Sequence, residues 1–233
     1  ATILYTSGTT GFPKGAVSTH YAALSALRAF ACRAVAGSMT QPEKEPNPFE
    51  TSFILSVPLF HVTGLVPVML SCFVNGFKLV MVYKWSPGRA LELIGRERVT
   101  QFVGVPTMTI DLLESPDFAT RDTSSLASVG GGGAPAPPEL VSRVDTSFKR
   151  ARPGLGYGMT ETNGHQYGKP GDSRDLVIGT SGVCCPGYDL RIFDANDPDR
   201  EAPPGTSGLV GGKGASLMLG YFNDRKAGED CIN

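Results

Sequence analysis

Short apolar runs that read as β-strands alternate with helical segments through most of this 233-residue chain. Strands are expected at residues 53–59, 78–83, 101–105, 128–129 and 153–157. Helices are expected between and after them, at residues 65–73, 87–97, 106–114 and 137–148. This order predicts βαβ units, and therefore an α/β fold with a mainly parallel sheet flanked by helices.

The two ends of the chain depart from this alternation. Residues 3–6 form a short β-prone run that enters a polar loop, and a helix is expected from Thr19 or His20 to about Val35, capped by Ser18 or Thr19. Near residue 187 the crossover helices stop, and strands at 188–194 and 207–212 are separated only by turns. We therefore expect an α/β subdomain over residues 1–187 and the start of a small, all-β, barrel-like subdomain over 188–233.

Composition excludes several classes of function. The formal net charge is −1 and no run of Lys and Arg occurs, which argues against nucleic acid as a partner. The five cysteines form no Cys-x-x-Cys pair and only three histidines are present, so neither a zinc site nor a disulfide framework is favoured. The cysteine content favours reduced thiols in a cytoplasmic protein.

One charge-free stretch, residues 51–77, has the length of a membrane span. It contains Pro58, Gly64 and Pro67, which would break a spanning helix. A buried strand, a loop and a buried helix explain it better, so no transmembrane segment is expected.

The strongest chemical motif is the loop at residues 6–15, Thr-Ser-Gly-Thr-Thr-Gly-Phe-Pro-Lys-Gly. Its glycines let backbone N–H groups approach an anion, its hydroxyls add donors, and Lys14 adds a positive charge. This combination suits a polyphosphate. It is not a Walker loop, because Pro13 precedes the lysine and Gly15 follows it. The alternative, a flexible linker, does not explain the Pro-Lys-Gly that closes the loop.

Three further segments carry polar or glycine-rich chemistry. Residues 156–161, Gly-Tyr-Gly-Met-Thr-Glu, offer an aromatic face, a hydroxyl and a carboxylate that suits Mg²⁺ beside a phosphate, although an ordinary glycine-rich turn is the alternative. Residues 131–135, Gly-Gly-Gly-Ala-Pro, would let a flat ligand lie close, or they form a loose loop. His61 follows an apolar strand. A histidine in that position is more often a buried core residue whose hydrogen bonds are satisfied within the protein.

The loop at residues 6–15 resembles the phosphate-binding signature of the adenylate-forming superfamily, which includes acyl-CoA synthetases, aryl-CoA ligases, luciferases and peptide-synthetase adenylation domains. The segment 156–161 resembles the second nucleotide motif of that superfamily. The resemblance implies that Lys14, His61, Thr160 and Glu161 are catalytic, that Tyr157 lies beside adenine, and that Thr160 contacts phosphate. It assigns Mg²⁺ to Glu161 and Thr10. The implied ATP- and AMP-binding residues are Thr6, Ser7, Gly8, Thr9, Thr10, Gly11, Lys14, Gly133, Ala134, Pro135, Gly156, Tyr157, Gly158, Met159 and Thr160.

The same resemblance implies an acyl pocket with His61 at its mouth, lined by Thr63, Gly104 and Gly133. The segments Phe-Pro-Lys-Gly and Pro-Leu-Phe-His resemble those of ligases for fatty or aryl acids. The implied reaction uses ATP and Mg²⁺ to convert a carboxylic acid to an acyl-adenylate, which coenzyme A then captures. Three alternatives stay open: a fatty acyl-AMP ligase that feeds a carrier protein, a non-catalytic nucleotide-binding module, and a structural or interaction domain.

The resemblance further implies that this chain is the central part of a longer enzyme. The N-terminal subdomain and the C-terminal lid domain of the superfamily are not in this sequence, and we expect this piece alone to turn over poorly or not at all. Residues 207–222 resemble the segment that precedes the hinge of these enzymes. The position after Gly208, where the superfamily often has Glu, holds Leu209, so any role of that carboxylate is absent or moved.

Overall fold

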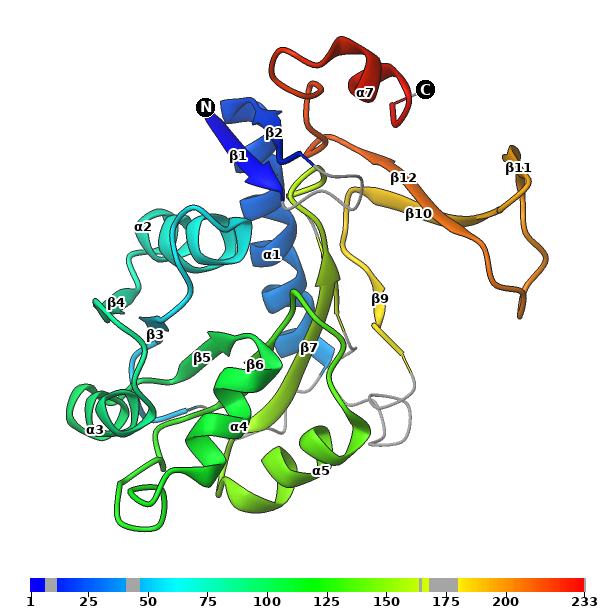
Figure 1. Ribbon diagram of the computed structural model, residues 1–233. Coiled ribbons are helices and arrows are strands. Elements are labelled where there is room, and N and C mark those ends of the chain that lie inside the picture. Colours follow the sequence, from blue (N-terminus) through cyan, green and yellow to red (C-terminus); the bar gives the residue numbers. More distant parts are fainter. Residues whose placement is uncertain (7–11, 41–46, 164, 168–179, 233) are drawn as a thin grey trace.

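The computed structural model describes residues 1–6, 12–40, 47–163, 165–167 and 180–232, and in this part of the chain one sheet forms the centre of the molecule (Figure 1). Its strand order is β4-β3-β5-β6-β7-β8-β9. The strands from β4 to β7 are parallel, and β8 and β9 continue the sheet in antiparallel pairing. The bounds are β3 (Ser52–Leu55), β4 (Lys78–Met81), β5 (Gln101–Gly104), β6 (Ser128–Gly131), β7 (Arg152–Gly158), β8 (His165–Tyr167) and β9 (Val183–Cys184). The predicted α/β fold with a mainly parallel sheet is confirmed.

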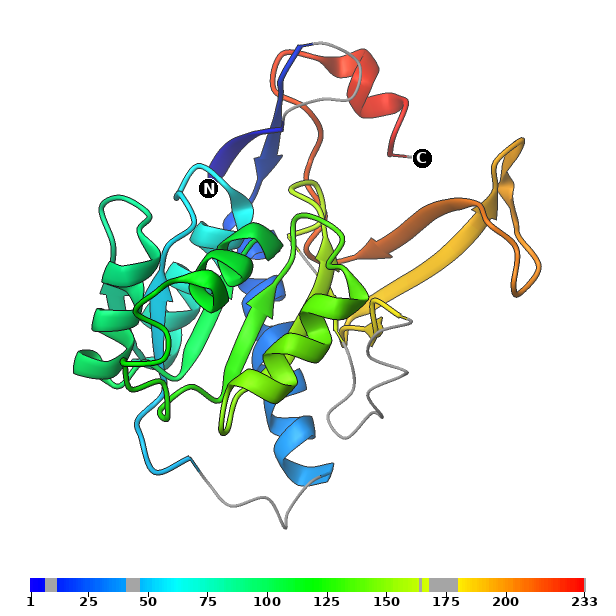
Figure 2. The same cartoon turned by 60° about the horizontal axis from the view of Figure 1, so that its bottom comes forward.

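Helices cover both faces of this sheet (Figures 1 and 2). One face carries α3 (Pro87–Glu97), α4 (Pro106–Glu114) and α5 (Pro138–Ser147). The other carries α1 (His20–Thr40), the π-helical η1 (Gly64–Leu70) and α2 (Ser71–Asn75). Each of α3, α4 and α5 begins with a proline, which suits the first helical position because its missing N–H would have no partner there.

Two separate cores result from this layering. The larger core lies between the sheet and α3, α4 and α5, and includes Ile54, Leu91, Ile94, Phe102 and Leu112, all fully buried. A smaller core joins α1, β1 and η1 through Leu4, Leu27 and Val66 among others. The two cores leave the second face of the sheet only partly filled, and the cavity described below lies there.

The charge-free stretch at residues 51–77 forms β3, a turn, η1 and α2, as predicted in outline. The strand ends at Leu55, earlier than the predicted Leu59, because the chain turns at Pro58, whose carbonyl accepts from the N–H of His61 at 3.0 Å. The predicted helix begins as a π-helix, with Pro67 inside it. No helix in the described residues is long and apolar enough to cross a membrane.

The first two strands form a β-hairpin, and the motif at residues 6–15 includes the end of the first strand and the start of the second. Strand β1 (Thr2–Thr6) pairs antiparallel with β2 (Lys14–Ser18), and Thr6 is opposite Lys14. Helix α1 follows at once, and the Thr19 hydroxyl accepts from the N–H of Ala22 at 2.9 Å, as expected of a capping residue. The helix continues to Thr40, past the predicted end near Val35.

The C-terminal part forms the three-stranded antiparallel sheet β11-β10-β12, which projects from the body as an arm (Figure 1). Its strands are β10 (Tyr188–Asp194), β11 (Asp197–Glu201) and β12 (Leu209–Gly214), and a short helix, α7 (Arg225–Glu229), follows. The strands expected at 188–194 and 207–212 correspond to β10 and β12. Strand β11 and helix α7 were not predicted, because both are short, polar and exposed.

Candidate active site

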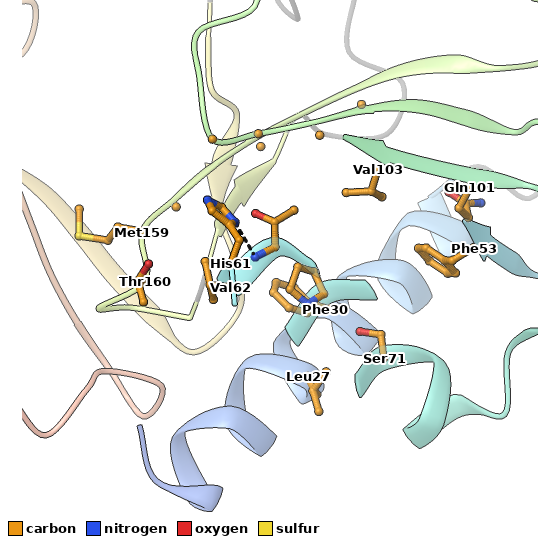
Figure 3. Close-up of a pocket in the computed structure, with 18 of the residues that line it drawn as sticks. Leu27, Phe30, Phe53, His61, Val62, Ser71, Gln101, Val103, Met159 and Thr160 are labelled. Atoms are coloured by element: carbon orange, nitrogen blue, oxygen red, sulfur yellow. Dashed lines mark hydrogen bonds between the residues drawn. The ribbon is translucent and has the colours of Figure 1, made fainter. Parts of the chain in front are cut away.

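A cavity of about 1150 Å³ lies along one face of the sheet, from Gln101 and Ser128 at the start of β5 and β6 to the edge formed by the carboxyl ends of β6 and β7. This edge is where open α/β sheets place their ligands. Its walls come from β3, β5, β6 and β7 on one side and from α1, η1 and α2 on the other (Figure 3). Segments far apart in the sequence therefore converge on one space.

Most of the predicted site residues that the structure describes line this cavity. They are Thr6, Lys14, His61, Thr63, Gly133, Gly156, Gly158, Met159, Thr160 and Glu161. Met159 and Thr160 follow β7, and His61 faces them from the turn that precedes η1 (Figure 3).

The remaining predicted residues lie elsewhere. Gly104 and Ala134 line a separate, small hollow between α4, α5 and β6. Pro135 is exposed in the loop after β6, and Tyr157, half-buried, alternates along β7 with the cavity-lining Gly156 and Gly158. Ser7, Gly8, Thr9, Thr10 and Gly11 lie outside the described residues.

His61 is held in a defined orientation at the middle of the cavity. Its Nδ1 accepts from the backbone N–H of Thr63 at 3.1 Å (Figure 3). The proton of the neutral ring is therefore on Nε2, which is left as a donor. Gly133 lies beside the ring with a φ of +87°, which favours glycine, and an added Cβ would make only an ordinary contact, 3.9 Å from Cε1 of His61.

Burial lowers the pKa of His61 below its ordinary value of 6.5. The folded protein therefore takes up this proton less readily than the unfolded chain, and its contribution to stability is full above pH 6.5 and is lost as pH falls through the lowered pKa. We expect the free energy of unfolding to fall between pH 7 and 5, and to fall less steeply in His61→Asn, whose amide oxygen can still accept from Thr63. Urea unfolding across that range measures both slopes.

The matched control for this comparison is His20→Asn at the exposed start of α1. It removes an exposed imidazole that does not line the cavity, and so controls for the loss of a histidine as such. A His61→Asn slope equal to that of the unchanged protein would show that the imidazole is not what titrates.

Lys14 and Glu161 carry opposite charges and lie at one end of the cavity, where both contact the side chain of Tyr221. Nζ of Lys14 is 5.3 Å from the ring centroid of Tyr221, and the Tyr221 hydroxyl donates to Oε1 of Glu161 at 2.7 Å. Lys14 begins β2 and Glu161 lies just past β7, so the fold brings an ammonium and a carboxylate to the same wall. Tyr221 belongs to the segment 207–222 that resembles the region before the hinge, and its place in the site was not predicted.

The donor set at Glu161 fits a Mg²⁺ ion held mainly by phosphate and water. Among the described residues, no group of three or more His, Cys, Asp or Glu side chains could hold a metal. Mg²⁺ commonly uses one or two carboxylates and takes its other ligands from phosphate and water. In the described part of the chain only Tyr221 donates a side-chain hydrogen bond to Glu161, so Oε2 is left to meet a cation.

The other end of the cavity contains a group of apolar side chains, with the polar side chains of Ser71 and Gln101 beside them (Figure 3). Leu27 and Phe30 of α1 face Phe53 of β3 and Val103 of β5 (Figure 3). The alternation along β5 explains part of this wall, because Phe102 points into the larger core and Val103 to the opposite face. Sequence analysis missed these residues, although the alternation itself was visible in the sequence.

The chain matches the model of one protein family, and its relatives include several acyl-CoA ligases. The model of the AMP-binding enzyme family matches residues 1–222. The chain is 31% identical over 233 residues to a mitochondrial medium-chain acyl-CoA ligase of Homo sapiens, covering 99% of this chain and 37% of the relative. It is 31% identical over 241 residues to a feruloyl-CoA synthase of Amycolatopsis sp, covering 99% of this chain and 44% of the relative.

A solved structure agrees with these relatives. The O-succinylbenzoate coenzyme A synthetase of Bacillus subtilis, in complex with AMP, superposes with a TM-score of 0.80 and 27% sequence identity. The superposition covers 100% of this chain and 45% of that one. The chain thus spans less than half the length of each of these relatives.

Proposed function

We propose, because this chain belongs to the AMP-binding enzyme family, that its protein uses ATP to activate a carboxylic acid and transfers the acyl group to coenzyme A. The observation that carries the proposal is the layout of the cavity described above. It has an ammonium and a carboxylate at one end, an oriented imidazole in the middle and an apolar wall at the other end. That layout suits a polyphosphate, a carboxylate and an apolar acyl group in line.

In the first step, an oxygen of the acid attacks the α-phosphorus of ATP, and the bond to the pyrophosphate oxygen breaks. Lys14 would oppose the charge that develops on the phosphate oxygens, and Thr160 would donate to a phosphate. Glu161, with Thr10, would hold the Mg²⁺, which when bound supplies further neutralisation of phosphate charge. Nε2 of His61 would donate to the carboxylate of the acid and orient it for attack.

In the second step, a thiol displaces AMP from the acyl-adenylate. Coenzyme A is the thiol supported by the relatives, which include a medium-chain acyl-CoA ligase and a feruloyl-CoA synthase. The wall formed by Leu27, Phe30, Phe53 and Val103 supports a fatty or aryl acid as the substrate.

We further propose that residues 1–187 bind the nucleotide and the acyl group, that residues 188–233 form part of an all-β subdomain, and that the protein is cytoplasmic. The lining of the cavity, which comes from residues before 187 apart from Tyr221, supports the first point, and the separate sheet β11-β10-β12 supports the second. The third point is supported by the reduced thiols that the cysteine content predicts.

The proposal is tested by identifying products from the protein expressed at its natural length. Incubated with ATP, Mg²⁺, coenzyme A and a panel of fatty and aryl acids, it should yield AMP, pyrophosphate and one acyl thioester per ATP, as measured by mass spectrometry. Formation of ADP and phosphate, or binding of ATP without turnover of any acid, would refute it. An acyl-adenylate that reacts with the thiol of a carrier protein but not with coenzyme A would replace the proposed acceptor.

A further inference from the structure

The segment from Ser216 to Phe222 runs along the free edge of β2 and joins the two charged parts of the site. The N–H of Leu219 donates to the carbonyl of Val17 at 2.8 Å, and the N–H of Phe222 donates to that of Gly15 at 2.7 Å. On its other side, the N–H of Met218 donates to the carbonyl of Glu161 at 2.8 Å. The backbone of this segment therefore sets the distance between the hairpin of Lys14 and the turn of Glu161.

Buried polar contacts anchor the same segment below the site. Ser216, which is 1% exposed, donates through its hydroxyl to the carbonyl of Thr162 at 2.7 Å. The amide of Asn163, fully buried, donates to the Ser18 hydroxyl at 2.7 Å and to the Ser216 carbonyl at 3.2 Å. These bonds leave little freedom to the backbone on which Tyr221 is carried.

The side chain of Tyr221 contacts both charges at once. Its ring lies under the ammonium of Lys14 in cation–π geometry, and its hydroxyl donates to Glu161. Burial and the bond to Glu161 both raise the pKa of Tyr221, so the phenol remains a donor across the physiological range. Lys14 and Glu161, both within the described residues, form no ion pair with each other.

Both charges contact the same phenol, and opposite charges that lie near one another attract, so loss of that phenol would favour a direct pair. A direct pair would occupy the ammonium that is needed for phosphate and the carboxylate that is needed for a cation. We propose that Tyr221 is a positioning residue that holds Lys14 and Glu161 apart, so that each remains available to one Mg·ATP. This inference rests on the proposed function.

Two substitutions separate the ring contact from the hydroxyl contacts. Tyr221→Phe keeps the ring under Lys14 and removes the hydroxyl, with its bond to Glu161 and its contact with Cys231, whereas Tyr221→Leu removes the ring contact as well. Tyr188→Phe is the matched control, because the Tyr188 hydroxyl lies in the same region but donates to the backbone carbonyl of Thr162 at 3.2 Å and contacts the Ser216 hydroxyl. It therefore tests the loss of a phenol oxygen without loss of a contact to a charged site residue.

The first readout is the Mg²⁺ dependence of acid-dependent turnover in the protein at its natural length. Loss of a hydrogen bond to a charged group should raise the Mg²⁺ concentration for half-maximal rate roughly tenfold in Tyr221→Phe. The KM for the acid should be unchanged. Tyr221→Leu should in addition raise the KM for ATP, and Tyr188→Phe should shift neither value.

The second readout needs no turnover. The rise in melting temperature caused by a non-hydrolysable ATP analogue is recorded as Mg²⁺ is titrated, and Tyr221→Phe should need about tenfold more Mg²⁺ for the same rise. Equal Mg²⁺ dependence in Tyr221→Phe and the unchanged protein, or equal shifts in Tyr221→Phe and Tyr188→Phe, would overturn the proposal. A protein that activates no acid but shows the melting shift would contradict the proposed function while supporting the role of Tyr221.

Discussion

Lys14→Ala is expected to lower the rate of acid-dependent adenylation by roughly 10²- to 10³-fold, the usual cost of removing one donor that stabilises developing charge. Lys14 lies on the same cavity wall as Glu161 and begins the second strand of the β1–β2 hairpin. The KM for the acid should change little, because the lysine lies at the end of the cavity opposite the apolar wall. Steady-state kinetics with varied ATP and acid measure both quantities.

The control for this variant is Lys84→Ala, in the loop between β4 and α3. Lys84 is exposed and does not line the cavity. Its removal should leave the kinetics unchanged and should alter surface charge by the same amount. Adenylation by Lys14→Ala within threefold of that of the unchanged protein would show that the lysine does not act on phosphate.

Gly131→Ala should be the most destabilising of the substitutions considered, with a loss of about 3 kcal/mol or more in the free energy of unfolding. Gly131 ends β6 with φ of +149°, and an added Cβ would overlap the carbonyl oxygen of Gly104 on the neighbouring strand. Backbone on both strands would have to move at the edge where the cavity opens. Urea unfolding of the purified variant measures the loss, and failure to accumulate folded protein is the limiting form of the same result.

Gly76→Ala separates the cost of the steric clash from the cost of the positive φ. Gly76 also has a positive φ, +66°, but an added Cβ would meet nothing within 4 Å. The expected loss is about 1 kcal/mol, from left-handed backbone alone. If the two variants lose the same amount, the close approach of β6 to β5 is not what requires glycine at position 131.

Elements whose signals are local were predicted well. Helices α3 and α4 have the predicted bounds, since each begins at a proline and has a regular apolar face. Strand β11 and helix α7 were missed because neither buries an apolar face, and hydrophobic periodicity is the signal on which such predictions depend. The early end of β3 follows from the turn that begins at Pro58, which a strand prediction based on apolar run length passes over.

The sequence could name residues of the candidate site, whose roles stay predictions, but not the contacts between them. Lys14, His61 and Glu161 could be named from motifs, and they do meet at one cavity. The contact of Tyr221 with both charges depends on a segment that returns to β2 from far along the chain, and a single sequence carries no signal for such pairing. Gly104 and Ala134 line the small hollow and not the large cavity. Their position likewise depends on how β5 and β6 pack against α4 and α5.

The central claim, that this cavity forms an acyl-adenylate, is tested most directly by exchange of labelled pyrophosphate into ATP without coenzyme A. The protein at its natural length should show exchange that requires both Mg²⁺ and a carboxylic acid, since only reversal of adenylate formation returns the label to ATP. Lys14→Ala should reduce that exchange in proportion to its loss of adenylation. Exchange that is absent with every fatty and aryl acid tried, in a folded protein whose melting temperature rises with Mg·ATP, would contradict the account and leave a nucleotide-binding module without this chemistry.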